Sequence, residues 1–196
     1  MRNKFISVRL VFVMSKKILV LVSHPQLQNS RINDALSKSA SEHPAVTVRH
    51  VDQVLVNEGT HFDADTEHRI IDAHDAIVLQ FPWYWYAMPG TLKKYLDEVL
   101  TPGWAYRGGN ALEKKPLLVA VSTGGPEQAY MEGGKNLFPM TTLLAPLIAT
   151  ANMVNMEWKE PFTVHGARTL SDGDLALATS EYVNRLDELV RELVTV

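Results

Sequence analysis

The sequence predicts an α/β protein in which helices cover both faces of a five-stranded parallel sheet. Short apolar runs of strand length, such as residues 18–22 and 116–122, recur along the chain. Between them lie segments whose apolar residues are spaced by three or four, which is typical of amphipathic helices. Strands that alternate with helices in this way form parallel sheets. The 196 residues contain no internal repeat or interdomain linker, so we expect a single domain.

Five strands are predicted, at residues 17–23, 46–51, 75–81, 116–122 and 154–158. His24 and Pro25 stop the first strand, whose residues are almost all apolar. The second alternates between apolar and polar side chains, which is typical of a strand with one exposed face. The fifth is either extended or interrupted through residues 163–164.

Five helices lie between and after these strands, at residues 31–40, 66–73, 91–100, 137–152 and 171–193. Ser30 is a good N-cap for the first helix, whose apolar stripe consists of Ile32, Ala35, Leu36 and Ala40. The fourth helix is predicted despite Pro139 and Pro146. The last helix starts at Ser171, and its expected buried side consists of Leu175, Leu186, Leu189, Val190 and Leu193.

The composition excludes several kinds of site and favours no charged partner. Hydrophobic residues make up 46% of the chain, charged residues make up 21%, and the net charge is −3. No dense basic block is present, so nothing favours a nucleic acid or an anionic membrane as a partner. There is no cysteine, which excludes disulfides, thiolate nucleophiles and Cys-ligated metal sites. This absence is compatible with a reducing compartment.

Residues 1–13 are predicted to be an extension ahead of a single domain at residues 14–196. They contain basic residues followed by a short apolar run from Leu10 to Met14. That run is shorter than the apolar region of a secretory signal, and it is far too short to span a bilayer. Met14 is an alternative initiator.

Four large aromatic residues, Trp83 to Tyr86, follow the third predicted strand between Pro82 and Pro89. Large rings are costly to leave in water, so something apolar should cover them. In a parallel α/β protein, ligands bind in the loops at the carboxyl ends of strands, which favours a planar cofactor. Packing in the core or at a subunit interface explains the rings equally well.

A phosphate site is expected where the first strand meets the first helix. Neither a G-x-G-x-x-G fingerprint nor a P-loop is present. The helix N-terminus offers free N–H groups and a positive dipole end, to which Ser30, Asn33, His24 and Arg31 add donors and charge. The alternatives are a plain N-cap for Ser30, a surface position for Asn33 and a structural role for His24.

The loop after the fourth strand, Ser122 to Tyr130, contains the pair Gly124 and Gly125. Consecutive glycines let the backbone approach a ring edge and present N–H donors to it. Such donors would stabilise the negative charge that develops on a reduced flavin. A simple glycine turn is the alternative.

Two other kinds of site are disfavoured. The acidic, histidine-bearing run comprises Asp63, Asp65, Glu67, His68, Asp72, His74 and Asp75. It has no recognised ligand spacing, so we interpret it as a solvated helix face and predict no metal site. A serine hydrolase is disfavoured because no G-x-S-x-G elbow is present.

The motifs HP…SRIN, QFPWYWYAMPGTLKKYLDEVLTPGWAY and STGGPEQAY resemble the flavodoxin-like NAD(P)H:quinone oxidoreductase family. Within it, the chain is similar to the ancillary oxidoreductases of glutathione-gated potassium-efflux systems and to general-stress oxidoreductases. The resemblance covers about residues 17–193. It implies a flavodoxin-like three-layer sandwich with strand order 2-1-3-4-5.

The resemblance also implies a flavin site. The flavin phosphate would lie against His24, Ser30, Arg31, Ile32 and Asn33. The ring would lie against Pro82, Trp83, Tyr84, Trp85, Tyr86, Ser122, Thr123, Gly124 and Gly125. Tyr130 would be the catalytic-site residue beside the nicotinamide or quinone. The expected cofactor is FMN, with FAD as the alternative, because the chain lacks a long C-terminal extension that could cover an adenosine.

The implied reaction is a two-electron hydride transfer from NAD(P)H through the flavin to a quinone, in a cytoplasmic homodimer. The alternative is a flavin-binding regulatory subunit of a membrane potassium-efflux transporter, held at the inner face of the membrane through that partner. A one-electron flavodoxin carrier is disfavoured by the aromatic wall. Some relatives have a histidine shortly after the Tyr130 position. Here Gly133, Gly134, Lys135 and Asn136 occupy that stretch, and Lys135 is the expected electrostatic substitute.

Overall fold

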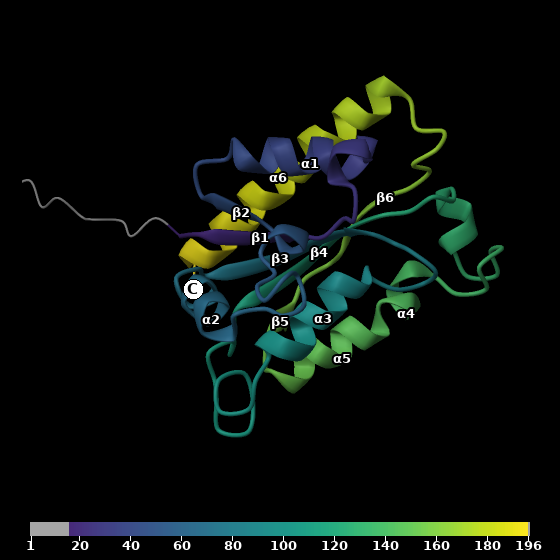
Figure 1. The fold of residues 1–196 in the computed structure, drawn as a ribbon. Coiled ribbons are helices and arrows are strands. Elements are labelled where there is room, and N and C mark those ends of the chain that lie inside the picture. The colour runs from purple at the N-terminus through teal and green to yellow at the C-terminus, as the bar shows by residue number, and fades with distance from the viewer. Residues whose placement is uncertain (1–15, 196) are drawn as a thin grey trace, which may run out of the picture.

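The computed structural model describes residues 16–195, which form one parallel sheet between two layers of helices (Figure 1). The sheet order is β2-β1-β3-β4-β5, and the short strand β6 also pairs with β4. All of these pairs are parallel. The predicted strand order is therefore confirmed, with one additional strand. The predicted extension at residues 1–13 and the alternative start at Met14 lie outside the described residues.

The strands are β1 (Ile18–Val22), β2 (Val46–His50), β3 (Ala76–Pro82), β4 (Pro116–Ser122), β5 (Glu157–Trp158) and β6 (Phe162–Val164). The α-helices are α1 (Arg31–Ser41), α2 (Ala64–Asp72), α3 (Gly90–Val99), α4 (Met140–Leu143), α5 (Ala145–Met153) and α6 (Asp172–Thr195). Short 3₁₀ turns are η1 (Leu27–Asn29), η2 (Val51–Gln53) and η3 (Glu127–Tyr130). Among the described helices, none combines the length and apolar composition that a membrane span requires.

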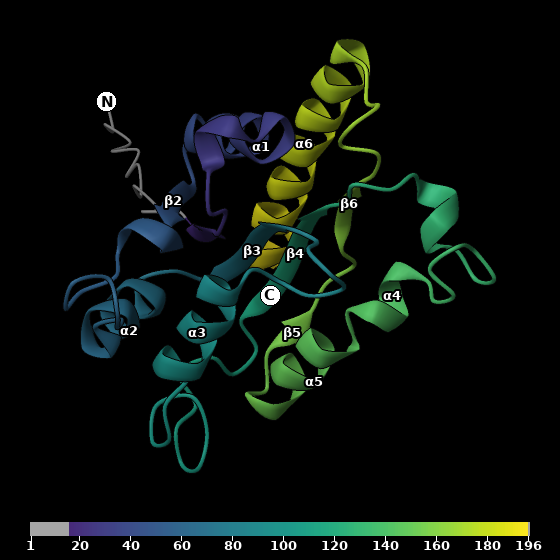
Figure 2. The same cartoon turned by 45° about the vertical axis from the view of Figure 1, so that its right-hand side comes forward.

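Alternating side chains along β1 divide the core into two layers. Ile18, Val20 and Val22 pack with α1 and α6, whereas Leu19 and Leu21 pack with α2, α3 and α5 on the other face. Because both faces are covered, β1, β3 and β4 are buried along their whole lengths. Figure 2 shows α1 and α6 on one side of the sheet and α3 and α5 on the other.

The predicted helix at residues 137–152 is wrong in its start and in its continuity. Helix α4 begins after Pro139, and α5 is a separate helix that carries Pro146 in its first turn. Proline lacks an N–H group and clashes with the preceding turn, so it is tolerated at the start of a helix but not within it. Each proline therefore marks a helix start.

The fifth predicted strand starts too early. Val154 instead caps α5, and the pairing with β4 is divided between β5 and β6. Pro161 lies between these two strands and cannot donate a hydrogen bond to a sheet. The alternative of an interrupted strand is therefore correct.

The acidic run around α2 is only partly solvated, which corrects the interpretation of a solvated helix face. Glu67 is 1% exposed and binds the Arg49 guanidinium through both carboxylate oxygens, at 2.8 and 2.5 Å. The buried Tyr95 hydroxyl donates to the same carboxylate at 3.0 Å. A buried charge needs such partners, so Glu67 links β2, α2 and α3. Within residues 16–195, no group of three potential metal ligands lies together.

Candidate active site

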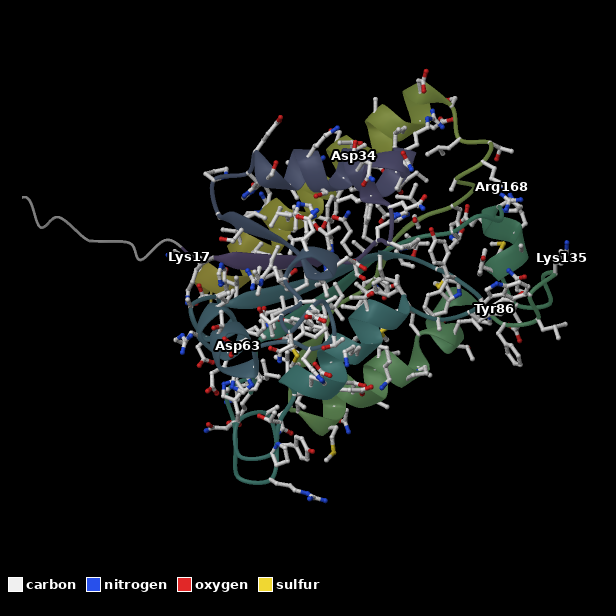
Figure 3. All side chains as sticks on the ribbon, viewed as in Figure 1. Lys17, Asp34, Asp63, Tyr86, Lys135 and Arg168 are labelled. Carbon is white, nitrogen blue, oxygen red and sulfur yellow. The ribbon has the colours of Figure 1, made fainter. Side chains whose placement is uncertain are left out.

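Two adjoining cavities lie where the carboxyl ends of the strands meet. The larger, about 780 Å³, is bounded by the loops after β1, β3 and β4 and by residues 167–168 after β6. The smaller, about 340 Å³, shares Trp83, Trp85, Gly124 and Arg168 with it. Figure 3 shows Tyr86, Lys135 and Arg168 at the same end of the molecule, opposite Lys17. This end of a parallel sheet is where open α/β proteins bind ligands.

Every site residue predicted from the sequence lines one or both cavities. The larger cavity is lined by His24, Ser30, Arg31, Ile32, Asn33, Pro82, Trp83, Tyr84, Trp85, Ser122, Thr123 and Gly124. The smaller is lined by Tyr86, Gly125 and Tyr130, together with the shared residues. The loops that carry these residues are far apart in sequence, so it is the parallel sheet that brings them together.

A third cavity, of about 1040 Å³, lies beside Pro116 at the opposite end of β4. Its lining consists largely of charged residues that neutralise one another, such as Lys16 with Asp75 and Lys159 with Glu157. Such a densely charged lining differs from that of most ligand sites, which have only a few convergent polar groups.

The N-terminus of α1 forms one wall of the larger cavity. The Ser30 hydroxyl accepts a hydrogen bond from the Asn33 N–H group at 3.2 Å, as expected for an N-cap. The Asn33 side chain is 1% exposed, and its amide donates to the Ser122 hydroxyl at 2.8 Å. Its Oδ1 atom is buried and has no partner among the described residues. A buried acceptor of this kind needs a donor, which a bound ligand could supply.

Arg31 lies at the same wall, but its guanidinium group is engaged elsewhere. It donates to the Leu170 carbonyl oxygen and to the Asp172 carboxylate, both at 2.5 Å. The side chain therefore joins α1 to the start of α6. The predicted contribution of this charge to a phosphate site would require the Asp172 pair to open.

His24 lies at the mouth of the larger cavity in a defined tautomer. Its Nδ1 atom accepts a hydrogen bond from the Gln26 N–H group at 3.0 Å, so the neutral ring carries its proton on Nε2. This Nε2–H group donates to the Tyr84 hydroxyl at 3.2 Å. Burial lowers the pKa of His24, although the charge of Asp52 acts in the opposite direction. At neutral pH the ring is therefore an uncharged donor.

The aromatic segment after β3 is a hairpin with a two-residue turn. Some of its rings lie in the core and others lie in solvent. Tyr84 and Ala87 exchange two backbone hydrogen bonds of 3.0 Å. Trp83 packs in the core, whereas Trp85 is 94% exposed and Tyr86 is 51% exposed. Trp85 and Tyr86 have φ values of 47° and 61°, as in a type I′ turn, where asparagine and glycine are favoured. Core packing thus applies to Trp83, whereas Trp85 and Tyr86 are exposed on this chain.

The glycine turn after β4 is held by the segment after β6. The Gly166 N–H group donates to the Gly125 carbonyl oxygen at 2.8 Å, and the Ala167 N–H group donates to that of Thr123 at 2.9 Å. A Cβ atom at Gly124 would meet no protein atom within 4 Å, so this position opens onto the cavity. A Cβ atom at Gly125 would lie 3.4 Å from the Tyr130 ring.

Tyr130 faces this turn from the smaller cavity. Burial raises the pKa of its hydroxyl, while the polar side chains of Thr123 and Asn136 act in the opposite direction. Asn136 also accepts a hydrogen bond from the Tyr86 hydroxyl at 3.0 Å, which connects the aromatic hairpin with the loop after η3. Lys135 is exposed at this end of the molecule.

The loop after β6 also borders the site, although the sequence did not predict it there. This loop places Ala167 and Arg168 in the cavity lining and His165 beside Tyr130, with ring centroids 5.3 Å apart. The rule that ligands bind at the carboxyl ends of strands would have indicated these residues had β6 been recognised as a separate strand. A histidine thus lies next to Tyr130 although the stretch after Tyr130 contains none.

A family model described as a flavodoxin-like fold matches residues 16–189. The chain belongs to this flavodoxin-like family. One relative is uncharacterized NAD(P)H oxidoreductase YdeQ of Bacillus subtilis (strain 168), 39% identical over 88% of this chain and 87% of its own length. Another is the glutathione-regulated potassium-efflux system ancillary protein KefG of Salmonella newport (strain SL254), 38% identical over 85% of this chain and 90% of its own.

Solved structures show the same flavodoxin-like fold. General stress protein 14 of Treponema denticola, in complex with FMN, is 32% identical, with a TM-score of 0.81, over 88% of this chain and 99% of that one. A structure described as a tryptophan halogenase from Streptomycin violaceusniger has the same TM-score of 0.81 and 38% identity, over 86% and 97%. An NADPH-quinone reductase from P. pentosaceus has a TM-score of 0.75 and 28% identity, over 85% and 95%. Since these names differ, the reaction must be inferred from the site.

Proposed function

We propose that this protein is an FMN-dependent NAD(P)H oxidoreductase that transfers two electrons to a quinone or a similar acceptor. The proposal depends mainly on one observation: a helix N-terminus, a glycine turn and an aromatic hairpin line one continuous pair of cavities. These features suit the phosphate, the edge and the face of a flavin, respectively. The names of the relatives, NAD(P)H oxidoreductase and NADPH-quinone reductase, support the reaction class.

The N-terminus of α1 would hold the phosphate and the sugar chain. The N–H groups of the first turn of a helix have no partner within the helix and carry the positive end of its dipole, so they attract a phosphate. The Ser30 hydroxyl adds a neutral donor. The His24 Nε2–H group orients the Tyr84 hydroxyl, which keeps its own proton to donate. The unpartnered Asn33 Oδ1 atom would accept a hydrogen bond from a hydroxyl of the ribityl chain. A sugar alcohol in the larger cavity would give this buried acceptor a donor, whereas an apolar ligand would leave it without one.

The residues of the smaller cavity would hold the substrate. When bound, the flavin supplies a ring that accepts a hydride from NAD(P)H and passes it to the acceptor. Trp85, Tyr86 and Tyr130 would form apolar walls that orient a planar substrate and exclude water from it. Backbone N–H groups of the Gly124–Gly125 turn would stabilise negative charge at the ring edge. The cofactor is proposed to be FMN because a relative with 32% identity is in complex with FMN; FAD is the alternative.

We also propose that a second copy of this chain covers the cavity mouth. Five exposed apolar or aromatic residues lie on the aromatic hairpin and on the loop after η3, which the Tyr86–Asn136 hydrogen bond connects. They are Trp85, Tyr86, Met131, Leu137 and Phe138, which we call the mouth patch. Their exposed fractions range from 51% for Tyr86 to 94% for Trp85. Patches of this kind mark interaction sites on soluble proteins. A homodimer would bury the patch and complete the walls of the substrate site.

Purification of the protein and identification of its bound cofactor test this function first. We expect a yellow protein that releases FMN on heating and then oxidises NADH or NADPH in the presence of a quinone. Mass spectrometry of the released compound separates FMN from FAD. A colourless protein that takes up neither flavin would contradict the proposal. A protein that binds flavin but forms a stable blue semiquinone without quinone turnover would indicate a one-electron carrier instead.

The variant Gly124→Val/Gly125→Val should lose flavin binding. A valine at 124 would occupy the open cavity, and one at 125 would press against the Tyr130 ring, which lies 3.4 Å from the position of its Cβ atom. The loss is measured by flavin fluorescence titration. Gly173→Val in the first turn of α6 is the control, because its Cβ atom would make only an ordinary contact of 3.8 Å. A double variant with unchanged flavin content would contradict the role of the turn.

A second candidate function is a regulatory subunit of a potassium-efflux transporter, supported by 38% identity to KefG. In that role the protein would act in the cytoplasm, at the inner face of the membrane, through its partner. The test is complementation of Salmonella cells that lack their own KefG. Restored glutathione-gated potassium efflux with this chain would support the second function. Quinone reduction by the pure protein without any restored efflux would favour the first function alone.

A further inference from the structure

His165 follows β6 and contacts two residues of the cavities. It is half-buried, and its ring lies 5.3 Å from that of Tyr130 at an angle of 31°. Its Nδ1 atom lies 2.9 Å from the Thr123 hydroxyl oxygen. His165 itself does not line either cavity, so any effect on a ligand must act through these neighbours.

The two polar neighbours of the Thr123 hydroxyl indicate a tautomer for His165. A threonine hydroxyl has one proton to donate. We assign this proton to the Gly125 carbonyl oxygen, which lies 2.9 Å away. The Thr123 oxygen then accepts from His165, which places the proton on Nδ1 and leaves Nε2 unprotonated in the neutral ring. This tautomer is the opposite of that of His24.

The resulting relay runs from His165 through Thr123 to Gly125. The Gly125 carbonyl oxygen also accepts from the Gly166 N–H group at 2.8 Å, so two donors hold it. One donor comes from the residue after His165, and the other is oriented by His165 itself. The carbonyl is thereby fixed toward the loop after β6, and with it the peptide between Gly125 and Pro126. The Ala167 N–H group likewise holds the Thr123 carbonyl oxygen at the other end of the Gly124–Gly125 turn.

We propose that His165 is a positioning residue that orients the Gly124–Gly125 turn for the cofactor by donating a hydrogen bond from Nδ1 to Thr123. This role rests on the proposed function, because the turn is the part of the site assigned to the ring edge. Thr123, Gly124 and Gly125 contact the cofactor in this assignment, and His165 acts one hydrogen bond behind them.

The relay persists when His165 changes its charge. Burial lowers the pKa of His165, although the charge of Glu127 on η3 acts in the opposite direction. The imidazolium also carries a proton on Nδ1, so the donor to Thr123 is present above and below this pKa. Neutral substitutes for the ring can therefore be judged by whether they keep a donor at the Nδ1 position.

Four variants separate the hydrogen bond from the packing of the ring. His165→Asn places an amide N–H group near the Nδ1 position, whereas His165→Phe keeps a ring against Tyr130 but has no donor. Thr123→Val removes the hydroxyl at nearly constant volume. The fourth is the double variant His165→Phe/Thr123→Val. His61→Phe is the control, because His61 is exposed and pairs with Glu98 away from the cavities.

The dissociation constant of FMN is the first measurement. We expect His165→Phe and Thr123→Val each to weaken binding about tenfold, as the loss of one hydrogen bond predicts. The dissociation constant of the double variant should be at most about twice that of either single variant, because both substitutions remove the same relay. His165→Asn and His61→Phe should remain within about threefold of the wild type. Additive losses in the double variant, or a loss in His165→Asn equal to that in His165→Phe, would overturn the proposal.

Imidazole ¹⁵N NMR of the flavin-free protein is the second measurement, and it does not depend on activity. It should show His165 protonated on Nδ1 and unprotonated on Nε2 at neutral pH, and Thr123→Val should shift the Nδ1 signal. A neutral ring protonated on Nε2 would overturn the relay. If the wild type binds no flavin, the proposed function is wrong. The tautomer seen by NMR then still tests the hydrogen bond from His165 to Thr123.

Discussion

Two residues of the aromatic hairpin have a backbone conformation that favours glycine. The left-handed region costs an ordinary residue about 1–2 kcal/mol, and both Trp85 and Tyr86 lie in it. Asparagine followed by glycine would form the same turn with less strain. The sequence instead has two large rings at the mouth of the cavity, one of them 94% exposed. Strain of this kind is common at functional sites, where a side chain is needed although its backbone conformation is unfavourable.

Replacing both residues should therefore stabilise the fold and impair the site. We expect Trp85→Asn/Tyr86→Gly to raise the free energy of unfolding by about 1–2 kcal/mol. FMN affinity should fall at least tenfold, because two walls of the site are removed. Urea unfolding and flavin titration measure the two effects.

Arg107→Gly is the matched control for this variant. Arg107 also has a positive φ, of 50°, and it lies in an exposed turn that does not line the cavities. This variant should gain stability without a change in flavin affinity. A hairpin variant that is less stable than the wild type would show that the rings support the fold rather than the site.

At the level of single residues, the sequence predicted positions better than contacts. Ser30 caps α1 as predicted, since an N-cap depends on local chain geometry. The burial of Asn33 and the engagement of Arg31 by Asp172 depend on β4 and α6, which are distant in sequence. No local pattern reports such contacts. The same is true of His165, whose neighbours Tyr130 and Thr123 lie on other elements.

At the level of elements, Glu98 on α3 fastens the segment that precedes α2. Its carboxylate accepts hydrogen bonds from Lys94, from the Phe62 N–H group at 2.8 Å, and from His61 at 3.1 Å. The hydrogen bond from Lys94, followed by that from the Phe62 backbone, lowers the pKa of Glu98 from 4.5 to about 2. These contacts favour the ionised carboxylate, so they are lost when it is protonated.

The stability that Glu98 contributes should therefore depend on pH. A carboxyl group with a lowered pKa binds fewer protons in the folded state, so its contribution is present above pH 4.5 and is lost as the pH falls toward about 2. We expect Glu98→Gln to be less stable than the wild type at pH 7 and to approach it near pH 2–3. Urea midpoints at several pH values measure this convergence.

Glu113→Gln is the control for this pH dependence. Glu113 is exposed and forms no ion pair within residues 16–195. Its variant should follow the wild-type profile throughout. A Glu98→Gln profile parallel to that of the wild type would mean that Glu98 does not couple the two segments through its charge.

The success of prediction for each element follows from the type of signal it carries. Strands β1, β3 and β4 are apolar and continuous, and their predicted and observed bounds agree closely. The segment 137–164 carries mixed signals, because its prolines interrupt apolar runs that otherwise suit one helix and one strand. The motif GWAY supported the resemblance, yet Trp104 stacks on His68 with ring centroids 3.8 Å apart, outside both cavities. A recognisable motif can thus be structural.

At the level of the whole molecule, the fold accounts for the site. In a parallel sheet all strands end at the same edge, so the loops after β1, β3, β4 and β6 converge without any sequence relation among them. This is why the predicted residues assemble even though their contacts could not be predicted. The sheet does not account for the mouth patch, which extends beyond its edge on the hairpin and on the loop after η3. A single copy of the chain leaves these side chains in water.

Self-association through the mouth patch is therefore the prediction for the whole molecule. The wild type should behave as a dimer, with about twice the mass of the 21.9 kDa chain. In Leu137→Glu/Phe138→Glu, two side chains that are 72% and 52% exposed in one copy become charged. Burying unpaired charges at an interface is costly, so the dimer dissociation constant should rise about 30-fold or more.

Val194→Glu is the matched control, because Val194 is an apolar side chain that is 60% exposed near the C-terminus, at the other end of the molecule (Figure 1). Its dimer should be as strong as that of the wild type. Sedimentation equilibrium gives the masses, and quinone reduction at dilutions above and below the dissociation constant shows whether the second copy completes the site. Activity that stays constant per chain while the mass halves would mean that each copy holds a complete site and that the patch serves another contact.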